Sequence, residues 1–212
     1  MGREIEIKIP LTSCQYQDLL EFVKGKKLID GISLSGNLIK LHKKDEYYSR
    51  FNSREERKSS GEPQVLRIRS EYDGQNQKSY ITIKRKKIEN GIELNIEDET
   101  FVENAEVIRE LFELSDYHCW FKKEKESYSI HSTSKVLPDI DFHLEIIKVN
   151  ELPYVEVEVT DSTVDADKVK KAISDYMILL SLDPNKKDTR SWVEIIESEN
   201  NTSSKGTLRS SP

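Results

Sequence analysis

The segment Glu4-Ile5-Glu6-Ile7-Lys8 constrains the fold most strongly, because its charged and aliphatic residues alternate without interruption. Alternation with a period of two is typical of a β-strand that has one polar and one apolar face. Later runs share this character, so we expect an antiparallel sheet in which one face carries charges. These later runs cover residues 65–69, 80–86 and 92–99.

The other elements follow from periodicity and from end signals. Pro10 ends the first strand, and Asn90-Gly91 predicts a hairpin turn between two later strands. Four stretches with apolar residues at helical spacing predict helices, the first of them capped by Thr12 or Ser13. The helical stretches cover about residues 13–24, 104–114, 166–181 and 190–197. Further ordered segments or strands are expected at 38–51, 119–130, 139–149 and 154–160.

The chain has 212 residues, and we expect one domain over residues 1–197. The charge-rich stretch 54–58 is expected to be an exposed loop. From Ser198 onward the chain is rich in Ser, Asn, Thr and Gly, which predicts a disordered tail over 198–212.

Charge and cysteine usage exclude several classes of protein. A net charge of −6 argues against a protein that coats nucleic acid or a membrane surface. The two cysteines have no CxxC spacing, and the start MGREIEIK lacks an apolar signal-peptide core. No apolar run approaches the roughly 18 to 20 residues of a membrane helix. We therefore expect a soluble, cytoplasmic protein, either a monomer or a homodimer.

Like charges recur two residues apart on the strands. Such residues project from one face about 6 to 7 Å apart, because a strand rises ~3.3 Å per residue. A solvated polar face is the simpler explanation, but it does not require carboxylates to come in pairs. The acidic pairs are Glu4/Glu6, Glu97/Glu99 and Glu156/Glu158, and the basic pairs are Arg67/Arg69, Lys84/Lys86 and Lys123/Lys125.

Paired carboxylates are hard oxygen ligands that suit Mg²⁺ or Mn²⁺, and Arg and Lys hold phosphate oxygens. A closed barrel with the charges inside would need water, metal and an anionic ligand, so a polyphosphate fits both signs of charge. Other phosphate and catalytic motifs are absent: the chain has no GxxxxGK[ST], GxGxxG or GxSxG sequence and no zinc spacing of its four histidines.

At this point the motifs resemble a known family. The segment Glu4-x-Glu6-x-Lys8 resembles the ExExK signature of the CYTH superfamily, the triphosphate tunnel metalloenzymes that include class IV adenylyl cyclases and thiamine triphosphatases. The further matching segments, in order over about residues 3–196, are Asp45-x-Tyr47-Tyr48, Leu66-Arg67-Ile68-Arg69, Ile83-Lys84, Lys123-x-Lys125-x-x-Tyr128, Leu144-Glu145, Tyr154-Val155-Glu156-Val157-Glu158 and Arg190-Ser191-Trp192-Val193-Glu194.

The resemblance implies an α+β fold, an eight-stranded antiparallel β-barrel with a charged lumen and helices packed outside. It implies metal ligands at Glu4, Glu6, Glu156 and Glu158, with Glu97 and Glu99 as further candidates. It implies phosphate contacts at Lys8, Arg67, Arg69, Lys84, Lys125 and Arg190. Catalytic roles are expected for Glu4, Glu6, Lys8 and Lys84, with Tyr48 or a lysine assisting proton transfer. For Lys86 and Lys123 two placements remain open, a phosphate contact in the lumen and a lysine at the rim or in solvent.

Two residues depart from the family pattern. Lys125 stands where Arg is usual, which loses the bidentate fork, and Glu145 stands where Asp is usual. The first functional hypothesis is a metal-dependent hydrolase of inorganic triphosphate, thiamine triphosphate or a nucleoside triphosphate. The alternatives are a class IV-type adenylyl cyclase that makes cyclic AMP and pyrophosphate from ATP, and a non-catalytic polyphosphate-binding module.

Overall fold

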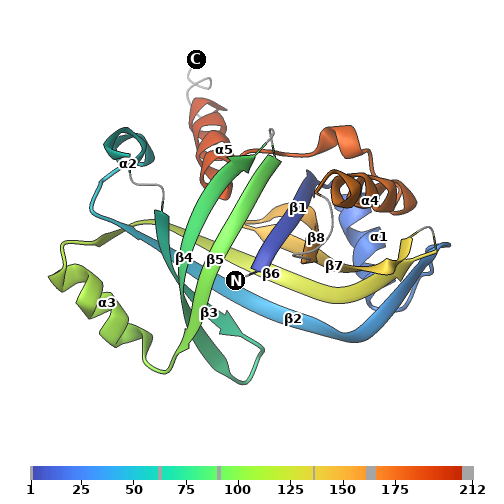
Figure 1. Ribbon diagram of the computed structural model, residues 1–212, viewed down its shortest axis with the longest axis horizontal. Helices are drawn as coiled ribbons and strands as arrows, with labels where there is room; N and C mark the ends of the chain where they lie inside the picture. The colour runs from blue at the N-terminus through green and yellow to red at the C-terminus, as the bar shows by residue number, and fades with distance from the viewer. Residues whose placement is uncertain (1, 62–63, 90–91, 136, 161–165, 207–212) are drawn as a thin grey trace, which may run out of the picture.

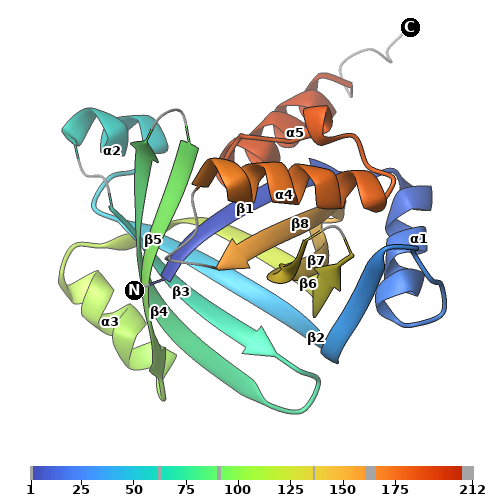
Figure 2. The same ribbon diagram turned by 45° about the vertical axis from the view of Figure 1, so that its right-hand side comes forward.

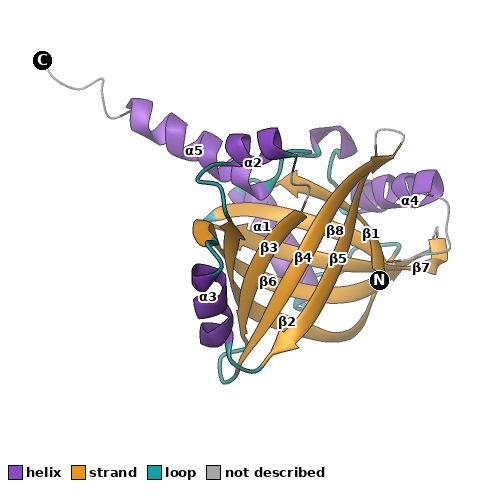
Figure 3. Cartoon of the chain, turned by 60° about the vertical axis from the view of Figure 1, so that its left-hand side comes forward, coloured by secondary structure: helices purple, strands orange, loops and turns teal. Residues whose placement is uncertain are grey.

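The computed structural model describes residues 2–61, 64–89, 92–135, 137–160 and 166–206. Within these ranges eight antiparallel strands form one strongly curled sheet in the order β1-β5-β4-β3-β2-β6-β7-β8, as Figure 3 shows. The strands are β1 (Gly2–Pro10), β2 (Ile32–Ser49), β3 (Gln64–Tyr72), β4 (Gln77–Glu89), β5 (Ile92–Val102), β6 (His118–Ser134), β7 (Leu137–Val149) and β8 (Leu152–Thr160). The predicted α+β architecture is confirmed.

The barrel closes through β1, and its two seams differ in length. Toward β8, β1 is paired in register from Glu4 opposite Thr160 to Pro10 opposite Tyr154. Toward β5, the pairing covers three positions only, beginning with Gly2 opposite Glu97. The sheet is thus a closed ring in which the pairing between β1 and β5 is short.

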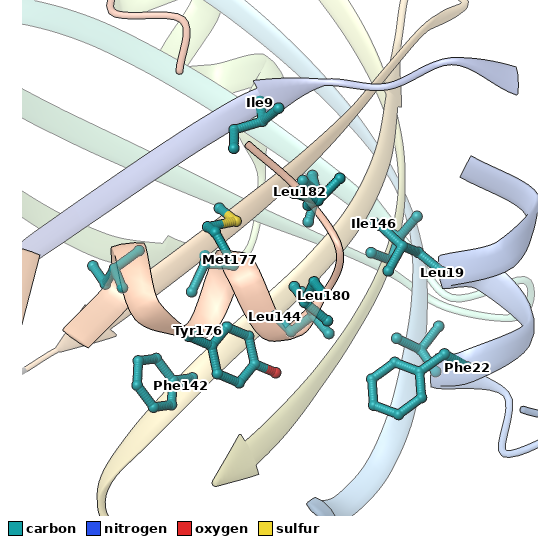
Figure 4. Packing of buried hydrophobic residues seen from close by; sticks show 14 of the residues in the cluster. Ile9, Leu19, Phe22, Phe142, Leu144, Ile146, Tyr176, Met177, Leu180 and Leu182 are labelled. Carbon is teal, nitrogen blue, oxygen red and sulfur yellow. The ribbon is translucent and has the colours of Figure 1, made fainter. Parts of the chain in front are cut away.

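Two helices cover the outside of the β1–β8–β7 wall (Figure 2). They are α1 (Ser13–Val23) and α4 (Ala166–Leu179). Thr12 is the N-cap of α1 and forms a reciprocal capping box with Gln15, which selects it from the two predicted caps. In the core beneath α4, the ring of Tyr176 stacks on Phe142 at 4.3 Å between centroids (Figure 4). Burial of such aromatic and aliphatic groups provides most of the stability of this wall.

A third helix, α3 (Ala105–Leu114), covers the outer face of the neighbouring wall. Its Phe112 packs with Tyr48 of β2 and Ile68 of β3, all of them buried. The helices predicted at about 13–24, 104–114 and 166–181 are therefore confirmed.

The last helix, α5 (Trp192–Gly206), follows a short 3-10 turn, η1 (Pro184–Lys186), and lies at one end of the barrel (Figure 1). Ile195 and Ile196 of α5 pack with Ile147, Val149 and Tyr154, and we call these five residues the α5 plug. The alternation of β7 and β8 places their three plug residues on the lumen face, next to Glu145 and Glu156. The plug therefore fills this end of the lumen with apolar side chains.

Three expectations need adjustment. The stretch expected as an exposed loop contains a short helix, α2 (Arg54–Ser60), because Ser53 accepts a hydrogen bond from the Glu56 amide and Glu56 accepts one from Asn52. Helix α5 continues past Ser198 to Gly206, because a capping box starts it and the plug residues anchor it. Strand β2 begins at Ile32 rather than Leu38.

The predicted Asn90-Gly91 turn lies outside the described residues, as does the predicted tail beyond residue 206. None of the helices in the described ranges combines the length and the hydropathy that crossing a bilayer requires.

Candidate functional site

The strand register brings the predicted charged residues to one face of the sheet, inside the barrel. Glu6 lies opposite Glu158, and Lys8 lies opposite Glu156. On the next seam Glu145 of β7 lies opposite Glu156. Directly opposed residues project to the same side of a sheet, so carboxylates from three adjacent strands share one wall of the lumen.

Asp45 of β2 is the centre of one cluster. It stands in register between Arg69 of β3 and Lys123 of β6. The guanidinium of Arg69 donates to both oxygens of Asp45, at 2.7 and 2.9 Å, and Lys123 Nζ lies 3.3 Å from Oδ2. Burial opposes ionisation of Asp45, which is 2% exposed, but Arg69 and Lys123 outweigh it and hold its pKa well below the usual range.

Lys125 of β6 is the centre of a second buried cluster. Its Nζ contacts Glu145 Oε2 and lies 2.6 Å from Glu156 Oε2. Lys43 of β2 lies 2.9 Å from the other oxygen of Glu145. Burial opposes ionisation of Glu145, yet Lys125 and Lys43 hold its pKa well below the usual range. Glu145 therefore acts as an anionic bridge between two lysines.

Arg67 organises the opposite wall. Its Nη2 lies 3.1 Å from an oxygen of Glu97 and 3.1 Å from an oxygen of Glu99. Lys84 Nζ lies 2.6 Å from Glu97, and Thr82 donates to Glu99 at 2.8 Å. Burial opposes ionisation of Glu97, but Lys84 and Arg67 lower its pKa. These two glutamates are compensated by cations of the chain itself.

Glu6 has the opposite character. Its side chain is exposed to the lumen, although the barrel wall encloses it. Burial and the nearby Glu156 raise the pKa of Glu6 to about 7, against the effect of Lys8, Lys84 and Lys125. Glu6 is thus a carboxyl group whose ionisation is opposed first by burial and then by the neighbouring Glu156.

Trp192 enters the lumen from α5. Ser191 is the N-cap of this helix, because its hydroxyl accepts from the Glu194 amide and Glu194 accepts from the Ser191 amide at 2.8 Å. The motif Arg190-Ser191-Trp192-Val193-Glu194 is therefore a capping box that places Trp192 at the first turn. Its indole lies 5.9 Å from Lys8 Nζ and 5.5 Å from Lys123 Nζ.

Two predicted residues lie elsewhere than expected. Tyr48 packs outside the barrel against Phe112, so it does not face the lumen, because neighbouring residues on a strand point to opposite faces. Tyr47 is the tyrosine on the lumen face, with its hydroxyl 3.4 Å from Asp45, and burial raises its pKa to about 12. Arg190 is exposed and donates to Asp188 at 2.7 and 2.9 Å.

The other predicted residues divide as follows. Lys123 is 5% exposed and belongs to the lumen rather than the rim. The side chains of Glu4 and Lys86 lie outside the described part of the chain. Sequence reasoning did not assign Lys43, Asp45 and Tyr47 to the site, although they alternate on β2 as the assigned pairs do on other strands.

The carboxylate wall fits a divalent cation in its donor chemistry. Glu6, Glu156 and Glu158 supply only hard oxygen ligands, which Mg²⁺ and Mn²⁺ prefer, and burial together with Glu156 raises the pKa of Glu6. Within the described ranges, no three His, Cys, Asp or Glu side chains form a group arranged to hold a metal. Glu156 is at present held by Lys125 and by the indole of Trp192.

Comparisons with known proteins agree with this geometry at the level of the fold. No family model matches the chain, and neither does any curated protein. Among solved structures, the PH1012 protein of Pyrococcus horikoshii superposes with a TM-score of 0.63 at 21% identity, covering 90% of this chain and 98% of that one. The PH1819 protein of the same organism gives a TM-score of 0.64 at 18% identity, covering 92% and 99%.

A third structure is HpAC1 from Hippeastrum, an adenylyl cyclase candidate with a dominant triphosphatase activity. It superposes with a TM-score of 0.58 at 13% identity, covering 94% of this chain and 96% of that one. The chain has the fold of these proteins. At these identities the comparisons show the fold alone.

Proposed function

We propose that the chain is a metal-dependent hydrolase of triphosphate substrates. The observation that carries this proposal is the pairing of buried cations with buried carboxylates inside one barrel. Ion pairs of this kind are costly to bury, and they contribute little to stability relative to apolar packing. A lumen that contains so many of them is better explained by ligand binding.

The chain's own carboxylates stand in for the phosphates of the ligand. Arg69 and Lys123 now contact Asp45, and Arg67 contacts Glu97 and Glu99. A triphosphate that enters the lumen offers these cations negatively charged phosphate oxygens, and the guanidinium group of an arginine can bind two such oxygens at once. Binding would therefore add phosphate oxygens as further acceptors for these cations, each of which has more than one N–H to donate.

Glu6, Glu156 and Glu158 would hold the metal, together with Glu4. A bound Mg²⁺ or Mn²⁺ supplies Lewis-acid polarisation of phosphate oxygens and lowers the pKa of a bound water. The lumen cations Lys8 and Lys84 would bind phosphate oxygens and stabilise the charge that develops on the leaving group. Tyr47, rather than Tyr48, is the tyrosine placed to orient a phosphate or a water.

The named activity of HpAC1 supports the hydrolase over the cyclase, because that protein has a dominant triphosphatase activity. The test is to incubate the purified chain with Mg²⁺ or Mn²⁺ and with ATP, thiamine triphosphate or inorganic triphosphate, and to identify the products. Release of phosphate supports the proposal. Cyclic AMP as the main product from ATP would make the chain a cyclase, and binding without turnover in Mg²⁺, Mn²⁺ and Co²⁺ would make it a binding module.

A matched pair of variants tests the assigned wall. The double variant Glu4→Gln with Glu6→Gln removes two charges from the lumen strand, and Glu21→Gln removes one from the exposed face of α1. We expect turnover to be lost in the first and kept in the second. Full metal-dependent turnover by the double variant contradicts the proposed ligands.

A further inference from the structure

Tyr80 of β4 and Phe101 of β5 continue the charged lumen face toward the end of the barrel away from the α5 plug. The register places Thr82 opposite Glu99 and, one rung further, Tyr80 opposite Phe101. The side chains of the first rung meet inside the lumen, where Thr82 donates to Glu99. Residues two apart on a strand share a face, so the aromatic rung also faces the lumen side.

The aromatic rung adjoins the cations that would hold phosphate. Tyr80 lies directly opposite Arg69 of β3, and opposed residues have Cα atoms about 4.5 to 5.5 Å apart. Phe101 lies two residues beyond Glu99, which is ~7 Å along the strand. Arg67 contacts Glu99 at 3.1 Å. The next group of a molecule whose phosphate is gripped by these arginines would therefore reach the two rings.

The two rings contact each other, but the ring of Phe101 is not covered by other described residues. Their centroids lie 6.1 Å apart with planes at 76°, an edge-to-face contact that holds both in place. Phe101 is nevertheless 57% exposed. Among the described residues, β1 pairs with β5 only at Gly2, Arg3 and Glu4, and the partner of Gly2 is Glu97, four residues before Phe101. An aromatic face is thus presented beside a charged lumen and left without a covering group in the described chain.

The α5 plug at the other end of the barrel determines the direction in which a ligand would extend. There the α5 plug fills the lumen with apolar side chains, and Trp192 lies against Lys8 and Lys123. An organic group attached to a gripped triphosphate extends away from the plug, which is toward Tyr80 and Phe101.

We propose that Tyr80 and Phe101 form a stacking platform for the aromatic group of an organic triphosphate, such as the base of a nucleoside triphosphate. This inference rests on the proposed function and narrows its substrate class, because inorganic triphosphate has nothing to place on the platform. Stacking of a heteroaromatic ring on aromatic side chains tolerates different ring systems. Tyr80 and Phe101 are therefore specificity residues and take no part in the chemical step.

The experiment compares kcat/KM for ATP and for inorganic triphosphate in the full chain, in Phe101→Ala, in Phe101→Trp and in Leu111→Ala. Leu111 lies on the outer side of α3 and is 54% exposed, so its variant controls for the loss of an exposed apolar group. We expect Phe101→Ala to lower the ratio of the two kcat/KM values roughly tenfold, mostly through KM for ATP. Phe101→Trp retains the ratio because it keeps a stacking surface, and Leu111→Ala retains it as well.

An unchanged ratio in Phe101→Ala, or the same fall in Leu111→Ala, overturns the platform while leaving the hydrolase intact. A wild-type chain that hydrolyses neither compound removes the proposed function. In that case calorimetry still tests the platform without turnover. It gives the ratio of the Kd values for ATP and inorganic triphosphate in wild type and in Phe101→Ala. Equal ratios in those two proteins contradict the platform.

Discussion

The indole Nε1 of Trp192 donates a hydrogen bond of 3.0 Å to Oε1 of Glu156, whose other oxygen lies 2.6 Å from Lys125 Nζ. Both oxygens of this carboxylate are therefore held, one from α5 and one from β6. Groups that orient a metal-binding carboxylate tune its affinity for the metal as well as its geometry. The capping box that starts α5 thus has a consequence inside the lumen, because it fixes the residue that orients Glu156.

We expect Trp192→Phe to lower kcat/KM by about tenfold to 150-fold, because hydrogen bonds to charged groups contribute about 1.5 to 3 kcal/mol. The ring is kept, so contacts with Lys8 and Lys123 survive in part. Steady-state kinetics across a Mn²⁺ titration measure the effect, which should appear as a weaker apparent metal affinity. Trp120→Phe is the control, since its buried Nε1 has no hydrogen-bond partner in the described structure. Equal losses in both variants would argue against an orienting role.

Asp45→Asn is expected to destabilise the chain by about 3 to 5 kcal/mol, because it leaves Arg69 and Lys123 as buried cations without their anion. Urea denaturation gives the change in the free energy of unfolding. Inorganic triphosphate should recover more stability in this variant than in wild type, since it supplies the missing negative charge. A variant as stable as wild type without ligand would show that Asp45 is not the counter-ion of this cluster.

Tyr47→Phe and Tyr48→Phe separate the two faces of β2. Tyr47 lies in the lumen beside Asp45, and Tyr48 packs outside against Phe112. We expect Tyr47→Phe to lower kcat or raise KM for a triphosphate, whereas Tyr48→Phe changes activity little, because its ring packing is retained. The comparison is made at equal fractions of folded protein. A larger kinetic loss in Tyr48→Phe would contradict the lumen placement.

The sequence predicted the charged strands well because their signal is local. Alternation assigns a face to every residue of a strand, so Arg67, Lys84 and Glu156 could be placed in the lumen once closure was expected. The prediction of Tyr48 did not apply this rule to β2, where alternation puts Tyr47 on the face of Asp45 and Tyr48 on the opposite face. The register with β3 and β6 agrees, because Asp45 lies opposite Arg69 and Lys123.

What the sequence could not predict depends on partners distant along the chain. Lys125 meets both Glu145 and Glu156, on two other strands, and this determines which glutamate is compensated. The α5 plug combines helix residues with the ends of β7 and β8, so composition alone suggested a tail where a helix continues. The pKa of Glu6 is raised and that of Glu97 is lowered, because different groups surround the two carboxylates. The i, i+2 pattern that both residues share in the sequence does not show these neighbours.

Lys123→Arg is expected to extend activity to higher pH. Burial lowers the pKa of Lys123 to about 8, with Lys125 and Arg69 adding to the shift against the effect of Asp45. The lysine therefore loses its charge as pH rises above about 8, and phosphate binding weakens. Arg stays protonated throughout this range. The measurement is the pH profile of kcat/KM, which reports on the free enzyme; identical alkaline limbs in wild type and variant would exclude Lys123 as their cause.

The last prediction concerns the stability of the metal-free chain and its dependence on pH. The pKa of Glu6 in the fold is raised from 4.5 to about 7, so the fold favours the protonated carboxyl. The stabilising contribution is complete below about pH 4.5 and is lost as pH rises through about 7. Glu6→Gln removes this dependence because the amide does not titrate.

Urea denaturation at a series of pH values, with divalent metal chelated, gives the difference in unfolding free energy between wild type and Glu6→Gln. We expect the unfolding free energy of wild type to fall relative to that of Glu6→Gln as the pH rises from about 4.5 to 7. Comparing the two proteins cancels titration of other groups such as His143, whose pKa is also raised, by its bond to Glu158. Mn²⁺ added above pH 7 should restore wild type but not the variant, because a cation neutralises the charged carboxylate. A difference that stays constant across the series would falsify the raised pKa of Glu6.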